Sequence, residues 1–370
     1  MRTLAVLNQK GGVGKTTTVA NVAAALAKSG QRVLVIDLDP QAHLTIHLGT
    51  DPRQIARGSY QVLTASVPIA EAAAQVRENL CLLGASVDLV GAETELVSVV
   101  GREIILREAL EPVADRFDYL LIDCPPSLGL LTLNALTAVQ EVIIPLQPHF
   151  LALQGLGKLL ETVAIVRKRI NPKLSVSGIL LCMFDRRVTL STEVRNDIEK
   201  FLSSARGTDC AWSQAQVIPT AIRPNVKLAE APSYGKTIFE YDDTCNGAND
   251  YRSVAEFIHH SLGKPIPAAP AVVEQSSQSS SESKPAEVIA SPAEIPSPGI
   301  SLAEPVATGI ERPTEPQKPM VPDTPQFSAP TPSHATPVTP VSTVESIPTP
   351  ISENVPVKPS ESENISVTQV

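Results

Sequence analysis

The sequence of 370 residues contains no run of about 18 consecutive apolar residues, so it predicts no membrane-spanning helix. It also has no C-x-x-C pair and no histidine at metal-ligand spacing from a cysteine. An odd, dispersed set of cysteines is typical of reduced thiols in a cytosolic protein. A glycine-rich motif begins within ten residues of Met1, so we expect neither a signal peptide nor an additional domain before it. The five cysteines are Cys81, Cys124, Cys182, Cys210 and Cys245.

Aromatic residues are scarce, at 4% of the chain, and residues 265–370 contain only Phe327. The same segment holds 21 of the 33 prolines, and its four basic residues face twelve acidic ones. It therefore carries most of the chain's net charge of −9 and buries too little apolar surface to offset its chain entropy. We expect a folded domain over residues 1–264 and a disordered, acidic tail rich in Pro, Ser and Thr over 265–370. The nearly neutral domain can still carry a local basic patch.

Short apolar runs alternate with longer helical patterns in the first 264 residues. Runs without polar alternation are typical of parallel strands that are buried on both faces. Alternation of strands with helices predicts an α/β fold with a doubly wound, mainly parallel sheet flanked by helices. Asp51–Ala74 is expected to be a loop with a short helix. The predicted strands are Thr3–Asn8, Arg32–Asp37, Leu80–Leu83, Tyr119–Asp123, Val142–Pro145, Ser177–Met183 and Gln216–Ile218. The predicted helices are Lys15–Ser29, Glu95–Leu110, Leu153–Ile170, Leu190–Leu202 and Ala248–Leu262.

The first predicted strand runs directly into a glycine-rich loop, which a helix follows. This order is the context in which a phosphate-binding loop is credible, because glycines let backbone N–H groups turn toward phosphate oxygens. Lys15 would reach the β- and γ-phosphates of a nucleotide, and the Thr16 hydroxyl would bind Mg²⁺. The loop differs from the general form G-x-x-x-x-G-K-[ST], since Gln9 replaces its first glycine and a second lysine, Lys10, follows. The expected nucleotide-binding residues are Gly11, Gly12, Val13, Gly14, Lys15, Thr16 and Thr17.

Carboxylates end two further apolar strands. Asp37 and Asp39 close the second strand, and Asp123 closes Tyr119–Asp123 just before two prolines. Ligands bind at the carboxyl ends of the strands in such sheets. A carboxylate at the end of a strand is also the position of the acid that holds Mg²⁺ in P-loop enzymes. The sequence therefore predicts a site for a nucleotide and Mg²⁺ at this edge.

The loop Lys-Gly-Gly-Val-Gly-Lys-Thr-Thr resembles the deviant Walker A box of the ParA/MinD family of P-loop ATPases. The segments Asp37-Leu38-Asp39-Pro40-Gln41 and Asp123-Cys124-Pro125-Pro126 are similar to further motifs of that family. The expected absence of an additional domain before the loop matches the shorter, Soj-like branch of ParA proteins. The resemblance covers approximately residues 2–262.

The resemblance implies an ATPase that needs ATP and Mg²⁺ and forms an ATP-dependent homodimer. In that family Lys10 would reach the nucleotide of the partner subunit, Asp37 would help to hold Mg²⁺ through water, and Asp39 would orient the attacking water. Arg223 and Lys227 occupy places similar to the basic residues of a DNA-binding surface, which would neutralise phosphates without reading sequence. The implied function is to position or segregate a chromosome, plasmid or protein assembly. The implied place is the cytoplasm, in association with the nucleoid, and hydrolysis would be stimulated by a ParB-like partner on the cargo.

Three other classes share this type of loop. A MinD-like ATPase acting at the membrane needs a short amphipathic helix with basic residues near its end, and residues 364–370 contain no basic residue. Reductase-type relatives need two suitably placed cysteines in each subunit for a shared iron–sulfur cluster. Amidoligases and small-molecule kinases need an acceptor pocket, and the sequence shows no distinct substrate domain. The Asp39-Pro40-Gln41 segment favours the partition branch.

Overall fold

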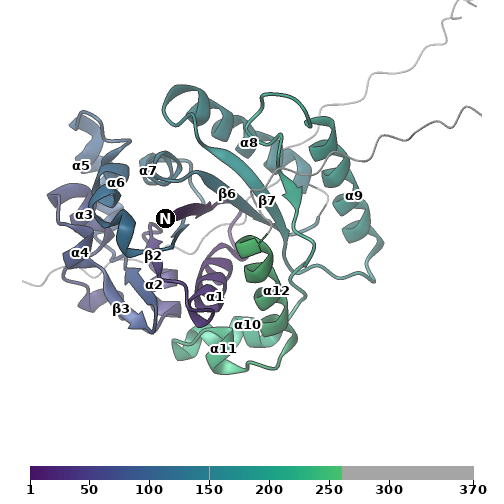
Figure 1. Ribbon diagram of the computed structural model, residues 1–370, viewed down its shortest axis with the longest axis horizontal. Helices are drawn as coiled ribbons and strands as arrows, with labels where there is room; N and C mark the ends of the chain where they lie inside the picture. Colours follow the sequence, from purple (N-terminus) through teal and green to yellow (C-terminus); the bar gives the residue numbers. More distant parts are fainter. Residues whose placement is uncertain (150, 261–370) are drawn as a thin grey trace, which may run out of the picture. The chain divides into compact units, whose positions relative to one another are not determined.

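The computed structural model describes residues 1–149 and 151–260, and this part of the chain forms one sheet with helices on both faces (Figure 1). The predicted tail 265–370 and the end of the last predicted helix lie outside the described residues. The strands are β1 (Arg2–Val6), β2 (Val33–Asp37), β3 (Ala74–Arg77), β4 (Leu80–Leu83), β5 (Tyr119–Asp123), β6 (Glu141–Leu146), β7 (Ser175–Leu181) and β8 (Gln216–Val217). The α-helices are α1 (Lys15–Lys28), α2 (His43–His47), α3 (Ser59–Ala65), α4 (Ile69–Ala72), α5 (Leu89–Glu95), α6 (Ile105–Leu110), α7 (Leu130–Ala138), α8 (Ala152–Arg169), α9 (Thr189–Ser204), α10 (Val226–Glu230), α11 (Ile238–Tyr241) and α12 (Asn246–His260).

Within the described residues the sheet has the strand order β3-β4-β2-β5-β1-β6-β7-β8. Every neighbouring pair is parallel except β3 and β4, which are antiparallel. The predicted doubly wound, mainly parallel fold is therefore confirmed. All seven predicted strands are present, with ends that differ by up to two residues, and β3 is an additional edge strand.

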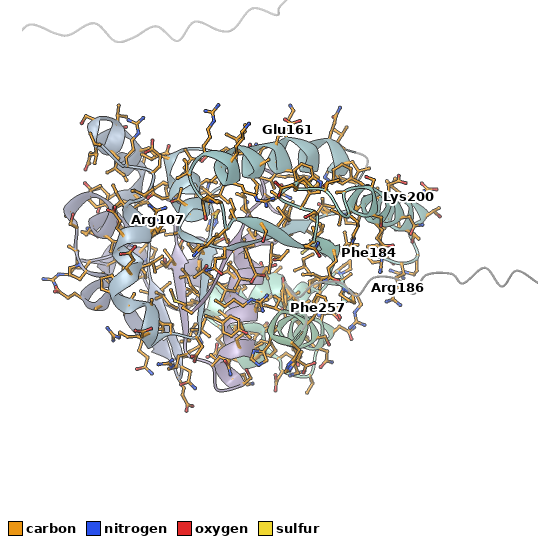
Figure 2. The ribbon with its side chains drawn as sticks, turned by 45° about the horizontal axis from the view of Figure 1, so that its top comes forward. Arg107, Glu161, Phe184, Arg186, Lys200 and Phe257 are labelled. Atoms are coloured by element: carbon orange, nitrogen blue, oxygen red, sulfur yellow. The ribbon has the colours of Figure 1, made fainter. Side chains whose placement is uncertain are left out.

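Side chains of the central strands alternate between two apolar cores, one on each face of the sheet. Leu4 and Val6 of β1 lie in the core that α1, α11 and α12 cover, and Ala5 lies in the other core, with residues of α5 to α9. Figure 1 shows α1 and α12 side by side on one face and α7 and α8 on the other. Charged side chains such as Glu161 and Lys200 project from the outer surfaces of α8 and α9 (Figure 2). Burial on both faces explains why these strands read as continuous apolar runs.

One predicted helix, Glu95–Leu110, is wrong as a single element. The chain forms α5 and a short 3-10 turn to Ser98, breaks, and resumes as α6 at Ile105. Val99 is extended and Gly101 has a φ of 74°, a left-handed conformation that no helix interior accepts. Apolar residues before and after this break continue a helical spacing, so the pattern alone concealed it.

Candidate functional site

The loop between β1 and α1 has the backbone of an anion-binding turn. Gly12 and Gly14 adopt left-handed conformations, with φ of 72° and 93°, which residues with a Cβ rarely adopt. Gly14 caps α1 without any side-chain hydrogen bond, so the first N–H groups of this 14-residue helix receive no side-chain partner there. Free N–H groups and the helix dipole together favour a phosphate at this place. The predicted loop residues thus surround the start of α1.

Lys15 is the cation of this loop, and its side chain is almost entirely enclosed. It is 7% exposed, and its Nζ donates to the carbonyl oxygen of Lys10 at 3.3 Å. Burial lowers the pKa of Lys15, while the carboxylates of Asp123 and Asp39 oppose that shift. A buried ammonium with one long hydrogen bond retains capacity for the oxygens of a bound phosphate.

Asp37 and Asp123 are register partners at the carboxyl ends of β2 and β5, as the sequence predicted. Asp123 Oδ2 accepts a hydrogen bond from the Thr16 hydroxyl at 2.7 Å, but the buried Oδ1 has no partner. Burial, and then the charge of Asp37, raises the pKa of Asp123 well above its usual range. An unpaired buried carboxylate oxygen beside a hydroxyl is a donor set that suits Mg²⁺. Among residues 1–149 and 151–260 no three His, Cys, Asp or Glu side chains form a complete cage, and Mg²⁺ in nucleotide sites usually takes its remaining ligands from water and phosphates.

Asp37 is held by its own shell rather than left open. Its Oδ2 accepts from the N–H and the hydroxyl of Thr45, at 2.9 and 2.8 Å, and its Oδ1 accepts from the Asp39 N–H at 3.1 Å. Burial raises the pKa of Asp37 to about 6 despite these bonds. Both oxygens of Asp37 thus accept hydrogen bonds within the chain, and the expected role of Asp37 in holding Mg²⁺ through water stays a prediction. Thr45 was missed by sequence reasoning, because a threonine in a short amphipathic segment carries no motif.

Asp39 is buried and lines a cavity of about 560 Å³ that residues of the loop also line. Its Oδ1 accepts from the Gln41 N–H at 3.0 Å, which fixes the turn after β2. The cavity is lined by Gly11, Gly12, Gly14, Lys15, Thr16, Thr17 and Asp39, and its lining also includes Pro126, Ile222, Leu228 and Tyr251. Such a mixture of charged and apolar lining suits a nucleotide, whose phosphates would lie at the loop.

Of the three residues predicted to be catalytic, Lys15 and Asp39 line this cavity, whereas Lys10 is not among its described lining residues. Its side chain is exposed and its Nζ lies 2.8 Å from Nε2 of His149, which follows β6. The Lys10 ammonium thus contacts a residue beyond the end of β6 and does not line the cavity. Sequence reasoning did not single out His149.

Both predicted DNA contacts are in ion pairs. Arg223 binds Asp250 through Nε and through Nη2, the latter at 2.6 Å, and the Asp250 side chain is only 7% exposed. Lys227 and Asp242 form an ion pair at the surface, and both side chains are partly exposed to solvent. Arg223 also lines the nucleotide cavity, so it has a structural contact on one side and the cavity on the other.

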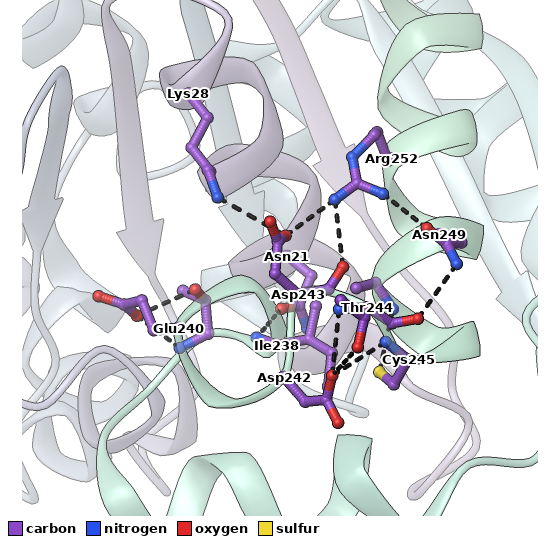
Figure 3. A network of polar contacts seen from close by, with 12 residues as sticks. Asn21, Lys28, Ile238, Glu240, Asp242, Asp243, Thr244, Cys245, Asn249 and Arg252 are labelled. Atoms are coloured by element: carbon purple, nitrogen blue, oxygen red, sulfur yellow. Dashed lines mark hydrogen bonds and ion pairs between the residues drawn. The ribbon is translucent and has the colours of Figure 1, made fainter.

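A polar network fixes this part of the chain against α1 (Figure 3). The Ile238 N–H donates to Asn21 Oδ1 of α1 at 2.8 Å. Asp243 forms an ion pair with Lys28 of α1, at 3.6 Å, and accepts a hydrogen bond from Arg252 at 2.8 Å. Asp242 also accepts from the N–H groups and hydroxyl that precede α12. The segment that carries Arg223 and Lys227 is therefore tied to the helix that begins at the phosphate loop.

His47 also lines the cavity and gives a testable pH dependence. It is 2% exposed, its Nε2 has no hydrogen-bond partner, and burial lowers its pKa to about 4. Below pH 6.5 the unfolded chain binds a proton at this residue that the folded chain does not, so stability falls as the pH falls. We expect this residue to cost about 2 kcal/mol of unfolding free energy between pH 7.5 and 5.

Urea unfolding of the wild type and His47→Gln at both pH values measures this effect. The variant should lose about 2 kcal/mol less than the wild type on acidification. Comparing the two proteins removes the contributions of the other titrating groups, provided that they are independent of His47. Equal losses would contradict a buried neutral imidazole at this position.

Comparisons with known proteins identify relatives of this chain. A family model described as an AAA domain matches residues 1–176. The sporulation initiation inhibitor protein Soj of Bacillus subtilis is 43% identical over 254 residues, which are 68% of this chain and 96% of that protein. The chromosome-partitioning ATPase Soj of Thermus thermophilus is 44% identical over 256 residues, 69% of this chain and 94% of that protein.

Solved structures give a similar result. Cobyrinic acid a,c-diamide synthase from Mycobacterium smegmatis, with a bound ATP analogue and magnesium, is 39% identical with a TM-score of 0.59. The match covers 70% of this chain and 94% of that one. Apo McdA from Cyanothece has a TM-score of 0.61 at 24% identity, over 70% of this chain and 99% of that one, and so shares the fold. None of the helices in the described part of the chain is long and apolar enough to cross a membrane.

Proposed function

Because this chain belongs to the ParA/Soj family of partition ATPases, we propose that it hydrolyses ATP to position or segregate a cargo. The observation that carries this proposal is the buried, unpaired Asp123 Oδ1 beside the Thr16 hydroxyl, in one cavity with Lys15. Structures similar to this chain hold ATP analogues, ADP and magnesium. ATP and Mg²⁺ are accordingly the substrate and the metal of this site.

In the proposed mechanism the chain's own residues bind the phosphates, hold Mg²⁺ and orient the attacking water. The N–H groups around Gly12 and Gly14 and the Lys15 ammonium bind the phosphates, while Thr16 and Asp123 hold Mg²⁺. Magnesium supplies charge neutralisation at the phosphate oxygens. Asp39 orients a water for attack, and its carboxylate, which lines the cavity, already accepts a hydrogen bond from the Gln41 N–H.

We further propose that ATP joins two subunits and that Lys10 acts across the interface. The exposed Lys10 side chain, which does not line the cavity of its own chain, supports this part of the proposal. The dimer would bind DNA without sequence preference through Arg223 and Lys227, in the cytoplasm at the nucleoid. Two linked copies of a weak basic surface bind more tightly than one. A ParB-like partner on the cargo would stimulate hydrolysis and so release the dimer.

Binding to random-sequence duplex DNA, measured by fluorescence anisotropy over a salt series, tests this proposal. We expect tight binding with ATP, weak binding with ADP, and a steep loss of affinity with salt. Lys227→Ala should reduce the magnitude of the slope of log affinity against log salt concentration by about 1 for each subunit. Lys200→Ala is the matched control, because Lys200 is an exposed lysine on a different helix, α9 (Figure 2). Equal binding with ATP and ADP would contradict nucleotide-gated DNA binding.

Arg223 needs a different substitution in this experiment. Arg223→Ala would leave the nearly buried Asp250 carboxylate without its guanidinium, so lost folding stability would confuse the result. Arg223→Lys keeps the charge and gives up the two-pronged contact. Lys227 is the cleaner position, since Asp242 retains hydrogen bonds from Thr244 and Cys245 after Lys227 is removed.

An amidoligase is the second candidate, because the synthase from M. smegmatis is 39% identical to this chain. Such an enzyme needs a place for an acidic acceptor. A groove of about 650 Å³ shares Gln41, Ile46 and Pro232 with the nucleotide cavity, and its described lining has one cation, Arg53, already paired with Asp51. This lining disfavours a carboxylate acceptor. Absence of DNA binding in both nucleotide states would instead direct the search to glutamine-dependent amidation.

A further inference from the structure

Lys10 is held at two points in the described structure. Its N–H donates to Asn8 Oδ1 at 2.9 Å, and its Nζ lies 2.8 Å from His149 Nε2. Asn8 Nδ2 in turn donates to the Pro145 carbonyl at 2.7 Å, so the phosphate loop is tied to the end of β6. Two strand ends far apart in the sequence thereby share one polar cluster around Lys10.

The contact with His149 requires one particular form of the imidazole. A lysine ammonium only donates, so Nε2 must carry the lone pair and the ring proton must be on Nδ1. The same Nδ1 lies 3.3 Å from the Leu151 N–H, which needs an acceptor. The two contacts therefore belong to different neutral forms of the ring. One form holds Lys10, the other accepts from Leu151 at the start of α8, and the protonated ring does neither.

We propose that His149 is a positioning residue that retains Lys10 on its own subunit, so that dimer formation must first break the Lys10–His149 contact. The inference rests on the proposed role of Lys10 across the dimer. When the contact with Lys10 is lost, the His149 ring can change tautomer, and its Nδ1 can accept a hydrogen bond from the Leu151 N–H. This hydrogen bond offsets part of the free energy lost with the Lys10 contact. Retention of Lys10 would lower the tendency of the subunit to dimerise until nucleotide provides a better partner for the ammonium.

The surroundings of His149 favour the neutral ring that this role needs. The side chain is half-buried, and burial together with the Lys10 charge lowers its pKa. The charged group that contacts the His149 ring from the phosphate loop is Lys10. Just before α8, the Leu151 N–H faces Nδ1 of the ring, and the Ala152 N–H donates to the His149 carbonyl. Acidification would replace the contact by repulsion between two cations and release Lys10.

Nitrogen NMR of histidine-labelled full-length protein tests the contact without reference to dimerisation. In the wild type without nucleotide we expect the His149 proton on Nδ1. In Lys10→Met, which keeps the length of the side chain without its charge, we expect the proton on Nε2 and a higher pKa of His149. His149→Gln identifies the resonance by its loss. An unchanged tautomer and an unchanged titration in Lys10→Met would overturn the inference.

Sedimentation of the full chain with a non-hydrolysable ATP analogue tests the consequence. His149→Ala should reach half-dimer at about threefold lower protein concentration than the wild type, the scale of an exposed polar pair. His149→Gln, which can still accept from Lys10 through its amide oxygen, should remain near the wild type.

The outcomes separate this inference from the proposed function. If Lys10→Ala prevents dimerisation while His149→Ala equals the wild type, the proposed function stands and the role of His149 is wrong. If Lys10→Ala dimerises like the wild type, the proposed role of Lys10 is wrong, and the inference is overturned with it. Thermal unfolding of each variant shows whether any difference arises from stability instead.

Discussion

Replacing Asp39 with Ala is expected to lower the rate of ATP hydrolysis about 10²- to 10⁴-fold and to leave ATP binding intact. The carboxylate lines the cavity, where it can orient a water, while the phosphate-binding groups belong to the separate loop around Lys15. Its removal therefore takes away a contact made to the attacking water and none made to the phosphates. The ATP-bound dimer should accumulate, and DNA binding with ATP should persist longer than in the wild type.

The matched control is Asp39→Asn. Asn retains an oxygen that can accept from the Gln41 N–H, so the turn after β2 is preserved while the charge is lost. We expect Asp39→Asn to hydrolyse ATP as slowly as Asp39→Ala. Phosphate release under single-turnover conditions gives the rate, and fluorescence of a labelled nucleotide gives the affinity. A variant with a normal rate of hydrolysis, or one that no longer binds ATP, would refute the assignment of Asp39.

The central sheet and the phosphate loop could be predicted because both depend on local rules. β4 and β5 have the predicted bounds because a strand buried on both faces requires an unbroken apolar run. The loop is recognisable because only glycine accepts the conformations at Gly12 and Gly14 without strain. Asp37 and Asp123 followed from the rule that parallel strands present their carboxyl ends at one edge.

Elements that depend on distant partners could not be predicted. Helix α7 has no amphipathic pattern, because its polar residues are buried: Asn134 donates to the Arg102 carbonyl and Thr137 to that of Glu103. Such bonds satisfy polar groups inside the core without any periodic signal. In the same way Thr45, His149 and Asp250 contribute to the site only through contacts formed on folding, with Asp37, Lys10 and Arg223.

The second large effect is expected at Asp123, where Asn should stabilise the nucleotide-free protein and impair it as an enzyme. The folded chain encloses this carboxylate with one oxygen unpaired, and burial raises its pKa well above the usual range. Between the ordinary carboxyl pKa and that raised value the folded chain binds more protons than the unfolded chain, so stability falls as the pH rises. Asn has no such titration. Its advantage should therefore be small in acid and reach about 1–3 kcal/mol near neutral pH.

The cost of the substitution should be seen only when Mg²⁺ and ATP are present. Asn retains an acceptor for the Thr16 hydroxyl but offers Mg²⁺ no negative charge, so turnover should fall at least about 10²-fold. Urea unfolding at pH 5 and pH 8, with EDTA and then with Mg²⁺ and an ATP analogue, separates the two effects. The wild type should gain more stability from the ligands than Asp123→Asn, because only a native state that binds them tightly is stabilised. A variant that is less stable than the wild type without ligand at pH 8 would show that the carboxylate supports the fold, and that the unpaired oxygen is not held for Mg²⁺.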